Sequence, residues 1–381
     1  MSNKRFVYLN HAGTSWPKPD CVDQVISKAV KTHPFSWPEQ FDTARRRIID
    51  YFHVEDPTRM LITPGCTSAL SISIADQAWF PEDVVLTSSF EHHALHRPLF
   101  KLAEMGVDLE VLPRTESEPI VLEVLENRLR EGGVKLIAIS AASNVTGEIL
   151  PVEETIRLAR EYGALVLIDG AQIAGWSDLD ISQLDADLFC WAGHKALHAP
   201  WGIGGLYVAN EVCLNSLSSE CESVATGEDG KEGAWHGCSA MPSYCDAGSA
   251  NVWAMIGMAA ALDWLDEPAQ ANRLEHARGL SAQLFDALLE MQDVSVYGPR
   301  DPQLRMPVVA FTTRKMLPAT MGNALRQKGI VASYGLQCAP LAHRKMGTGP
   351  HGVVRLSCGP LNTQEEITFV IEAIAQIVKN A

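Results

Sequence analysis

Ala-Asp-Leu-Phe-Cys-Trp-Ala-Gly-His-Lys (186–195) and the preceding Ala-Leu-Val-Leu-Ile-Asp-Gly-Ala-Gln (164–172) decide the fold of this chain. Each begins as an apolar, β-rich run, which is typical of a buried strand. The stretch 186–195 ends in a turn with Lys195, and the stretch 164–172 carries Asp169 at the end of its apolar run. A lysine and a carboxylate at the ends of neighbouring buried strands suit a pyridoxal phosphate (PLP) enzyme, in which the lysine forms the Schiff base and the acid pairs with the pyridinium nitrogen.

Strand-like and helix-like patterns alternate through the middle of the chain. A helical pattern covers 152–161, and strand patterns fall at 84–87, 109–112, 135–140, 165–169 and 188–190. This alternation predicts an α/β fold with a mostly parallel sheet and helices on both faces. Functional residues are then expected at the ends of the strands.

The segment 217–250 is the least regular part of the chain and predicts a long exposed loop, a kind of segment that is often functional or mobile. Helical patterns follow at 252–264 and 270–291, and the remainder favours a separate α+β lobe. We therefore expect a large cofactor-binding domain at 16–265. Residues 1–15 and 266–381 are expected to form a smaller α+β domain.

Composition and charge disfavour several classes of protein. The 381 residues suffice for one large domain and a smaller one, and 46% hydrophobic with 20% charged residues is ordinary for a globular protein. The net charge of −15 argues against nucleic acid as a partner. The sequence has no signal-peptide pattern and no apolar run of about 18 residues, so no membrane span is expected. Nine cysteines without a CxxC pair predict reduced thiols in a cytoplasm.

The residues of the opening stretches also have ordinary explanations. Asp169 could cap the turn that follows it, and Gln172 could complete a capping box or contact a ligand oxygen. Lys195 could be a surface lysine. However, 192–205 contains few other charges, and such surroundings disfavour the ammonium form, as imine chemistry requires. A buried carboxylate also needs a partner, and a protonated pyridine nitrogen is a good one.

Gly65-Cys66-Thr67-Ser68 lies between a strand pattern at 60–63 and a helical pattern at 69–76. A small-residue turn at a helix N-terminus offers free backbone N–H groups to an anion, although an ordinary capped helix would look the same. The sequence contains neither a P-loop nor a GxGxxG after a strand, so nucleotide cofactors are disfavoured.

His92 and His96 are four residues apart and could share a helix face, as zinc ligands do. No second ligand group stands out nearby, so no metal is expected. A flat imidazole that stacks on an aromatic cofactor is the better interpretation of His92.

Cys338 lies in Ser-Tyr-Gly-Leu-Gln-Cys-Ala-Pro-Leu-Ala-His (333–343), a composition that predicts a loop and an accessible thiol. An inert buried thiol is the alternative. Arg355 lies in a short apolar strand pattern, where it could join a structural ion pair or clamp a substrate carboxylate through two hydrogen bonds.

Together these motifs resemble the class V aminotransferase family of PLP fold type I, and within it the cysteine desulfurases and selenocysteine lyases. The resemblance runs nearly end to end, from Tyr8 to the Asn362-Thr motif. Its most specific parts are Ser143-Asn-Val-Thr-Gly, Asp169-Gly-Ala-Gln, Gly193-His-Lys and the loop at 335–343.

The resemblance implies roles around the cofactor ring. Lys195 would form the internal aldimine, and His92 would stack on the ring as a further catalytic residue. Asp169 would pair with the pyridine nitrogen, and Gln172 would reach the phenolic oxygen. Asn144 would lie beside the cofactor and the substrate.

The resemblance also implies how the phosphate is held. Thr67, the backbone at Cys66, and His194 would bind it. Ser249 stands where the family uses a threonine to reach the phosphate of the partner subunit, which implies a homodimer with shared active sites.

For the substrate, the resemblance implies contacts from Ala12, Gly13 and Asn144, with Arg355 on the α-carboxylate. Cys338 matches the family's nucleophile. It would attack the sulfur of PLP-bound cysteine, giving alanine and an enzyme persulfide that a sulfur-acceptor protein could collect. Such a nucleophile must be a thiolate.

Several positions depart from the family pattern. Ser333 and Gln337 stand where the family loop usually has Arg and His. Ala192 replaces a phosphate-binding Ser or Thr, and Ser249 replaces Thr. The sequence therefore predicts a PLP-dependent, cysteine desulfurase-like enzyme. The alternatives are a C–S lyase that acts by β-elimination, a selenocysteine lyase and, remotely, a non-catalytic binding protein with this fold.

Overall fold

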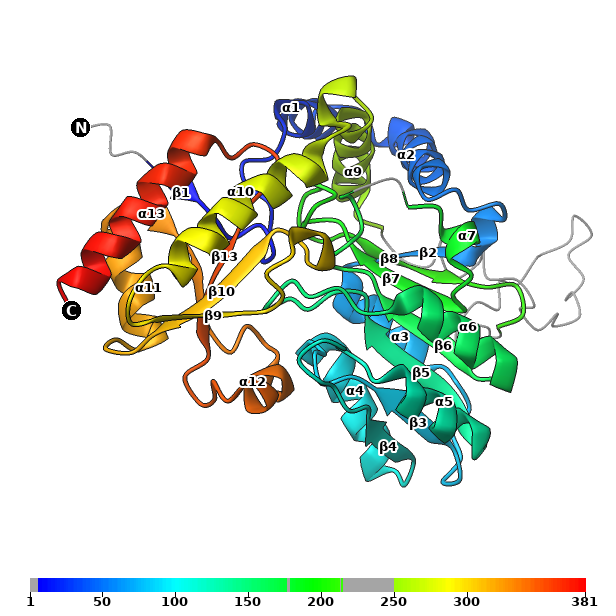
Figure 1. The fold of residues 1–381 in the computed structure, drawn as a ribbon. Coiled ribbons are helices and arrows are strands. Elements are labelled where there is room, and N and C mark those ends of the chain that lie inside the picture. Colours follow the sequence, from blue (N-terminus) through cyan, green and yellow to red (C-terminus); the bar gives the residue numbers. More distant parts are fainter. Residues whose placement is uncertain (1–5, 177–178, 213, 215–249) are drawn as a thin grey trace, which may run out of the picture.

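The computed structural model describes residues 6–176, 179–212, 214 and 250–381 (Figure 1). Its centre is a seven-stranded sheet in the order β2-β8-β7-β6-β5-β3-β4. The bounds of these strands are β2 Met60–Thr63, β3 Val84–Thr87, β4 Asp108–Val111, β5 Val134–Ser140, β6 Leu165–Asp169, β7 Leu188–Ala192 and β8 Gly204–Val208. All six strand patterns found in this part of the sequence, including the one at 60–63, are present as strands, with ends that differ by up to two residues.

The sheet is mostly parallel, as predicted. Strands β7, β6, β5, β3 and β4 pair in parallel, and only β8 runs antiparallel to its neighbours β7 and β2. Strand β8 was not predicted, because its first two residues, Gly204 and Gly205, have low strand propensity. A Cβ at Gly204 would lie 2.6 Å from the carbonyl carbon of Gly65 and 2.7 Å from the amide nitrogen of Cys66. Glycine is required there because the strand passes directly against the turn that begins α3.

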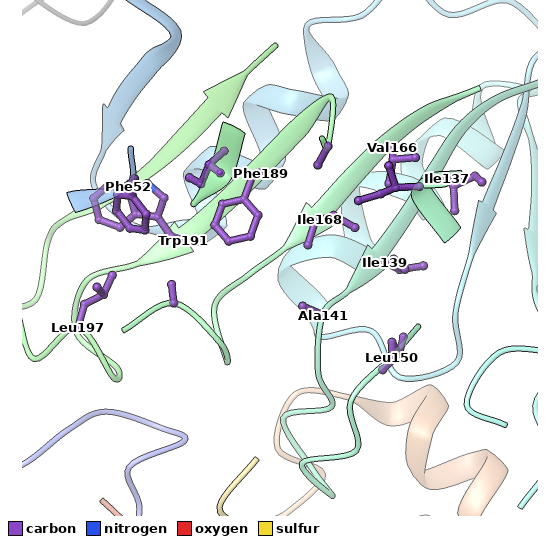
Figure 2. Packing of buried hydrophobic residues seen from close by; sticks show 14 of the residues in the cluster. Phe52, Ile137, Ile139, Ala141, Leu150, Val166, Ile168, Phe189, Trp191 and Leu197 are labelled. Atoms are coloured by element: carbon purple, nitrogen blue, oxygen red, sulfur yellow. The ribbon is translucent and has the colours of Figure 1, made fainter. Parts of the chain in front are cut away.

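Helices cover both faces of this sheet, which confirms the α/β fold. Alternating side chains divide between the faces: Leu136 and Ala138 belong to the core on one face. Ile137 and Ile139 belong to the core on the other face, which Figure 2 shows. Helices α3 Cys66–Ala75 and α4 His93–Glu104 contribute to the core on the first face. The second face is covered by α2 Trp37–Tyr51, α5 Leu122–Arg130, α6 Val152–Tyr162 and α9 Val252–Leu265. The remaining helices here are α1 Asp20–Ala29, which packs on α9, and the short α7 Ile181–Leu184.

The C-terminal part forms a four-stranded antiparallel sheet in the order β12-β13-β10-β9. Its elements are α10 Arg273–Leu289, β9 Val294–Tyr297, β10 Val308–Thr313, α11 Pro318–Gln327, β12 Ser333–Gly335, α12 Pro340–Met346, β13 Val353–Ser357 and α13 Gln364–Lys379. The predicted helix at 270–291 begins later, at Arg273, because Pro268–Gln270 forms a separate 3₁₀ turn. Other 3₁₀ turns are Pro34–Ser36, Pro57–Arg59 and Pro302–Leu304.

The N-terminal strand joins the C-terminal part. Strand β1 (Val7–Tyr8) pairs in parallel with β11 (Ile330–Val331), and Val7 and Leu9 are buried in the second core with residues of α10, β10 and α13. The division into domains at 16–265 and at 1–15 with 266–381 stays a prediction. Nearly all of the predicted loop at 217–250, and Ser249 with it, lies outside the described residues. Within the described ranges no helix is both long and apolar enough to cross a bilayer.

Candidate active site

A cavity of about 490 Å³ opens where β6 and β7 end, between the N-terminus of α3 and the β12–α12 loop. It brings together every predicted site residue that the structure describes. Those residues are Ala12, Gly13, Cys66, Thr67, His92, Asn144, Asp169, Gln172, His194, Lys195, Cys338 and Arg355. Ala192, Ser333 and Gln337, the positions that depart from the family pattern, line the same cavity.

Asp169 is the last residue of β6 and is 6% exposed. Its Oδ1 accepts hydrogen bonds from the backbone N–H of Ala171 at 3.0 Å and from the thiol of Cys66 at 3.4 Å. The carboxylate therefore does cap the following turn, and it also faces the cavity. All of its side-chain hydrogen bonds found among the described residues use Oδ1, so Oδ2 is the oxygen that can take a ligand proton.

Lys195 follows β7 and lines the cavity together with Asp169. Burial lowers the pKa of the Lys195 ammonium, and the nearby Arg355 lowers it further, while Asp169 and Cys66 act in the opposite direction. A lowered pKa increases the fraction of neutral amine, which is the form that attacks a carbonyl carbon.

Gln172 lies in the turn after β6 and is 7% exposed. Its Nε2 donates to the carbonyl oxygen of Ala12 at 3.1 Å. The alternative of a capping box is not what the structure forms, because the amide ties the N-terminal segment to the cavity wall.

His92 is the N-cap of α4, and its Nδ1 accepts from the backbone N–H of Ala94 at 3.0 Å. Burial lowers the pKa of His92 to about 4, with Lys195 as the next cause, so the ring is neutral at pH 7 and Nε2 carries the proton. The helix begins at His93, so His92 and His96 do not share a helix face. Among the described residues no group of three or more His, Cys, Asp or Glu side chains could hold a metal.

The small-residue turn at 65–68 lies at the N-terminus of α3. This helix begins at Cys66 and not at residue 69 as the helical pattern predicted. The first backbone N–H groups of a helix have no partner within it. Amides of Cys66 and Thr67 are therefore available beside the cavity, which both residues line. Burial raises the pKa of the Cys66 thiol well above its usual value, so this side chain is a neutral donor to Asp169.

His194 lines the cavity and has a buried polar atom without a partner. Its Nδ1 is buried without a hydrogen-bond partner, and its ring packs on Trp201 with centroids 5.3 Å apart. Burial lowers the pKa of His194 to about 4, and the neighbouring Lys195 and Lys18 add to the effect. A neutral imidazole with a free nitrogen, in a cavity that the N-terminus of α3 also lines, fits a phosphate.

Arg355 on β13 is 4% exposed and forms no ion pair with a described carboxylate. Its Nη1 donates to the carbonyl oxygen of Asn144 at 2.6 Å, and its Nη2 donates to Oδ1 of Asn10 at 2.9 Å. Burial lowers its pKa to about 10, so the guanidinium stays charged at neutral pH. A buried cation without a carboxylate in a cavity favours the carboxylate clamp over the structural ion pair.

Cys338 is exposed in the loop between β12 and α12, which confirms the prediction of an accessible thiol. Gln337 and Cys338 both have left-handed backbone, with φ of 42° and 58°. Three hydrogen bonds hold this conformation: Asn144 Nδ2 to the Gln337 carbonyl at 2.7 Å, Gln337 Nε2 to the Val353 carbonyl at 3.2 Å, and the His93 N–H to the Cys338 carbonyl at 2.7 Å. The loop is therefore held by residues distant in sequence, from the start of α4, from the segment after β5 and from β13.

Sequence reasoning missed two polar groups of this region, Asn10 and Glu91. Asn10 bonds Arg355, as described above. Glu91 is fully buried and accepts from the backbone N–H and the hydroxyl of Ser140 at 2.9 and 2.6 Å, and from the hydroxyl of Ser88. Burial raises its pKa to about 7. For Glu91, the available signal was an acid four residues after the apolar strand pattern at 84–87.

The fold and this set of residues are those of a PLP fold type I protein, and the chain belongs to the class V aminotransferase family, whose model matches residues 7–370. Among curated proteins it is similar to probable cysteine desulfurases. One, from Vibrio cholerae, is 30% identical over 99% of this chain and 95% of that protein, and another, from Pseudomonas aeruginosa, is 34% identical over 86% and 80%.

Two solved structures of cysteine desulfurases are also similar to this chain over nearly its whole length. The apo structure of a cysteine desulfurase from Thermococcus onnurineus superposes with a TM-score of 0.86 at 25% identity, covering 99% of this chain and 95% of that one. The cysteine desulfurase CsdA from Escherichia coli superposes with a TM-score of 0.84 at 25% identity, covering 98% and 95%.

Proposed function

We propose that this chain is a PLP-dependent cysteine desulfurase that converts L-cysteine to L-alanine and leaves a persulfide on Cys338. The observation that carries the proposal is the exposed Cys338 thiol, held in a left-handed loop at the edge of the cavity that contains Lys195 and Asp169. Membership of the family and the likeness to cysteine desulfurases support it.

The cavity fits PLP on its own chemistry. Lys195 has a lowered pKa and can provide the amine for the Schiff base, and Asp169 has Oδ2 free to pair with the pyridine nitrogen. His92 would stack on the ring, and Gln172 would reach the phenolic oxygen. When bound, the cofactor supplies an electron sink for the substrate.

The phosphate would be held by the N-terminus of α3 and by His194. Backbone amides of Cys66 and Thr67, the Thr67 hydroxyl and the free Nδ1 of His194 are the groups that would bind it. Ala192 has no hydroxyl to add, so His194 and the helix N-terminus would provide more of the binding free energy here.

Substrate orientation would come from Arg355 and Asn144. The guanidinium is buried, charged and held by Asn10 and by the Asn144 carbonyl, so little reorganisation is needed when it meets an α-carboxylate. Ala12 and Gly13 complete this side of the cavity. Carboxylate binding at Arg355 would turn the substrate sulfur toward Cys338.

The sulfur transfer is a displacement at sulfur. The Cys338 thiolate forms an S–S bond with the substrate sulfur while the Cβ–S bond of the substrate breaks. The bonding electron pair passes to the carbon skeleton, and protonation at Cβ completes alanine. Cys338 is left as a persulfide, so no external oxidant or reductant is needed.

A C–S lyase that releases pyruvate by β-elimination is the second candidate, and Gln337 favours it. The family usually has a histidine at this position, but Gln337 uses its Nε2 to hold the Val353 carbonyl. The loop beside Cys338 therefore has no imidazole at 337 to exchange a proton with the thiol. Selenocysteine is a substrate that the same site could accept.

Replacing Cys338 decides between these functions. Cys338→Ser should abolish alanine and persulfide formation from L-cysteine, because a serine hydroxyl does not attack sulfur, while cofactor absorbance is retained. The measurement is alanine against pyruvate produced from cysteine, cystine and selenocysteine. Cys21→Ser, a partly buried thiol on α1, serves as the control and should behave as wild type. Alanine release that survives in Cys338→Ser would rule out the desulfurase mechanism.

We further propose a homodimer with shared active sites and a sulfur-acceptor protein that collects the persulfide. The homodimer is supported by the position of Ser249 in the family pattern, and the acceptor protein by the exposure of Cys338.

A cytoplasmic location is supported by the unpaired thiols of Cys21, Cys66, Cys190, Cys338 and Cys358. Separate cores in the two sheets support the domain division at 16–265 and at 1–15 with 266–381.

A further inference from the structure

The carbonyl oxygen of His194 belongs to the peptide that joins His194 to Lys195, and it is surrounded by hydrogen-bond donors. The backbone N–H of Ser15 lies 2.9 Å from it, the hydroxyls of Thr14 and Ser15 lie 3.0 and 3.2 Å from it, and Nζ of Lys18 lies 3.0 Å from it. A carbonyl oxygen has two lone pairs, so this set of donors exceeds what backbone satisfaction requires.

Lys18 is the unusual member of this set. Its Nζ has two hydrogen bonds, to the His194 carbonyl and to the Ser15 hydroxyl at 2.7 Å. No described carboxylate forms an ion pair with it, and burial lowers its pKa to about 7. A partly buried ammonium without a counter-charge is costly, and an apolar side chain of similar length would fill the same space at less cost. The amine is therefore best explained by the carbonyl to which it donates.

The other donors are themselves held in place. Nε1 of Trp201 donates to the Thr14 hydroxyl at 3.0 Å, and the Trp201 ring packs on the ring of His194. Thr14, Ser15 and Lys18 thus contact the backbone carbonyl of His194, and Trp201 contacts its imidazole. The peptide plane ahead of Lys195 is fixed from the N-terminal segment, far away in sequence.

We propose that Lys18 is a positioning residue that orients Lys195 through the carbonyl of His194. Fixing this peptide plane fixes the direction in which the Lys195 side chain leaves the backbone. The amine is then directed at the reactive carbon of the cofactor instead of sampling the whole cavity. The inference rests on the proposed function only for the identity of the cofactor.

Two cofactor forms separate positioning of Lys195 from general damage to the site. Pyridoxal phosphate can form an imine with Lys195, whereas pyridoxamine phosphate carries an amine instead of the aldehyde and cannot. Both use the same ring and phosphate contacts. Substitution of a residue that acts through Lys195 should therefore weaken the binding of pyridoxal phosphate and leave the binding of pyridoxamine phosphate unchanged.

The experiment measures the dissociation constants of both forms for the full chain freed of cofactor. Lys18→Met should weaken pyridoxal phosphate about tenfold or more and leave pyridoxamine phosphate within about twofold of wild type. Lys28→Met, an exposed lysine on α1, is the matched control and should change neither. Thermal unfolding of each variant checks that the chain remains folded.

Thr14→Val is the second variant and keeps the test decisive should Lys18→Met fail to fold. It removes another donor to the same carbonyl, so a smaller loss restricted to pyridoxal phosphate is expected. Equal weakening of both cofactors, or wild-type binding of both, overturns the role of Lys18. Neither result depends on alanine formation from cysteine, so failure of the desulfurase proposal would be recognised separately.

Discussion

The floor and the rim of the cavity are built in different ways. The floor consists of Asp169 and Lys195, which end or follow strands of a buried parallel sheet. The rim consists of the loop with Gln337 and Cys338, whose left-handed backbone is held by the Asn144 side chain and the backbone N–H of His93. Under the proposed function, the difference teaches that cofactor binding and choice of reaction would reside on separate structural elements, since Asp169 and Lys195 would serve any PLP reaction and the rim carries the thiol.

Removal of Lys195 should have the largest effect. Lys195→Ala should abolish both turnover and the visible imine absorbance of the purified protein, because no other lysine lines the cavity among the described residues. The spectrum should contrast with that of Cys338→Ser, which keeps the absorbance and loses alanine formation. Persistence of the absorbance in Lys195→Ala would show that the floor is assigned wrongly.

Asp169→Ala should have the second largest effect on cofactor retention and turnover. Loss of one partner of a buried charge pair costs about 3–5 kcal/mol, so both cofactor retention and turnover should fall severely. Cofactor retention is measured by dialysis and turnover by alanine release. Asp180→Ala, which removes an exposed carboxylate that caps α7, is the control for loss of a capping acid. Near-normal turnover in Asp169→Ala would contradict its role on the floor.

Glu91, a buried acid outside the floor and the rim, should make the stability of the protein depend on pH. Its folded-state pKa is raised to about 7 from 4.5, so the unfolded state ionises first and Glu91 lowers the free energy of unfolding as pH rises from 4.5 to 7. Above pH 7, the resulting decrease in the free energy of unfolding is about 3 kcal/mol. Glu91→Gln should remove this part of the pH dependence.

The measurement for Glu91 is urea unfolding of wild type and variant at several pH values across that range. The stability of wild type relative to Glu91→Gln should decline toward pH 7. Glu118→Gln, at an exposed position, should give a pH-independent difference. A constant difference for Glu91→Gln would mean that this carboxyl titrates normally.

How much of the site the sequence predicted depends on whether a residue's signal is local. Asp169 and Lys195 each follow an apolar run, and Cys66 and Thr67 lie in a small-residue turn before a helix, so their positions could be predicted. Strand β8 could not, because its glycines obscure strand propensity and are required by tertiary contacts, Gly204 with the Gly65–Cys66 turn and Gly205 with the ring of Trp191. His92 was placed on a helix because one-residue errors in helix boundaries are inherent to patterns.

The sequence by itself determined the α/β class, the strand ends that carry the acid and the lysine, and the accessible loop around Cys338, because periodicity and turn residues are local properties of the chain. The tertiary structure alone decided that Arg355 faces the cavity without a carboxylate partner, that Glu91 bonds Ser140, and that Lys18 meets the carbonyl before Lys195. Those contacts join residues far apart in sequence, and they exist only once burial has removed water as the competing partner.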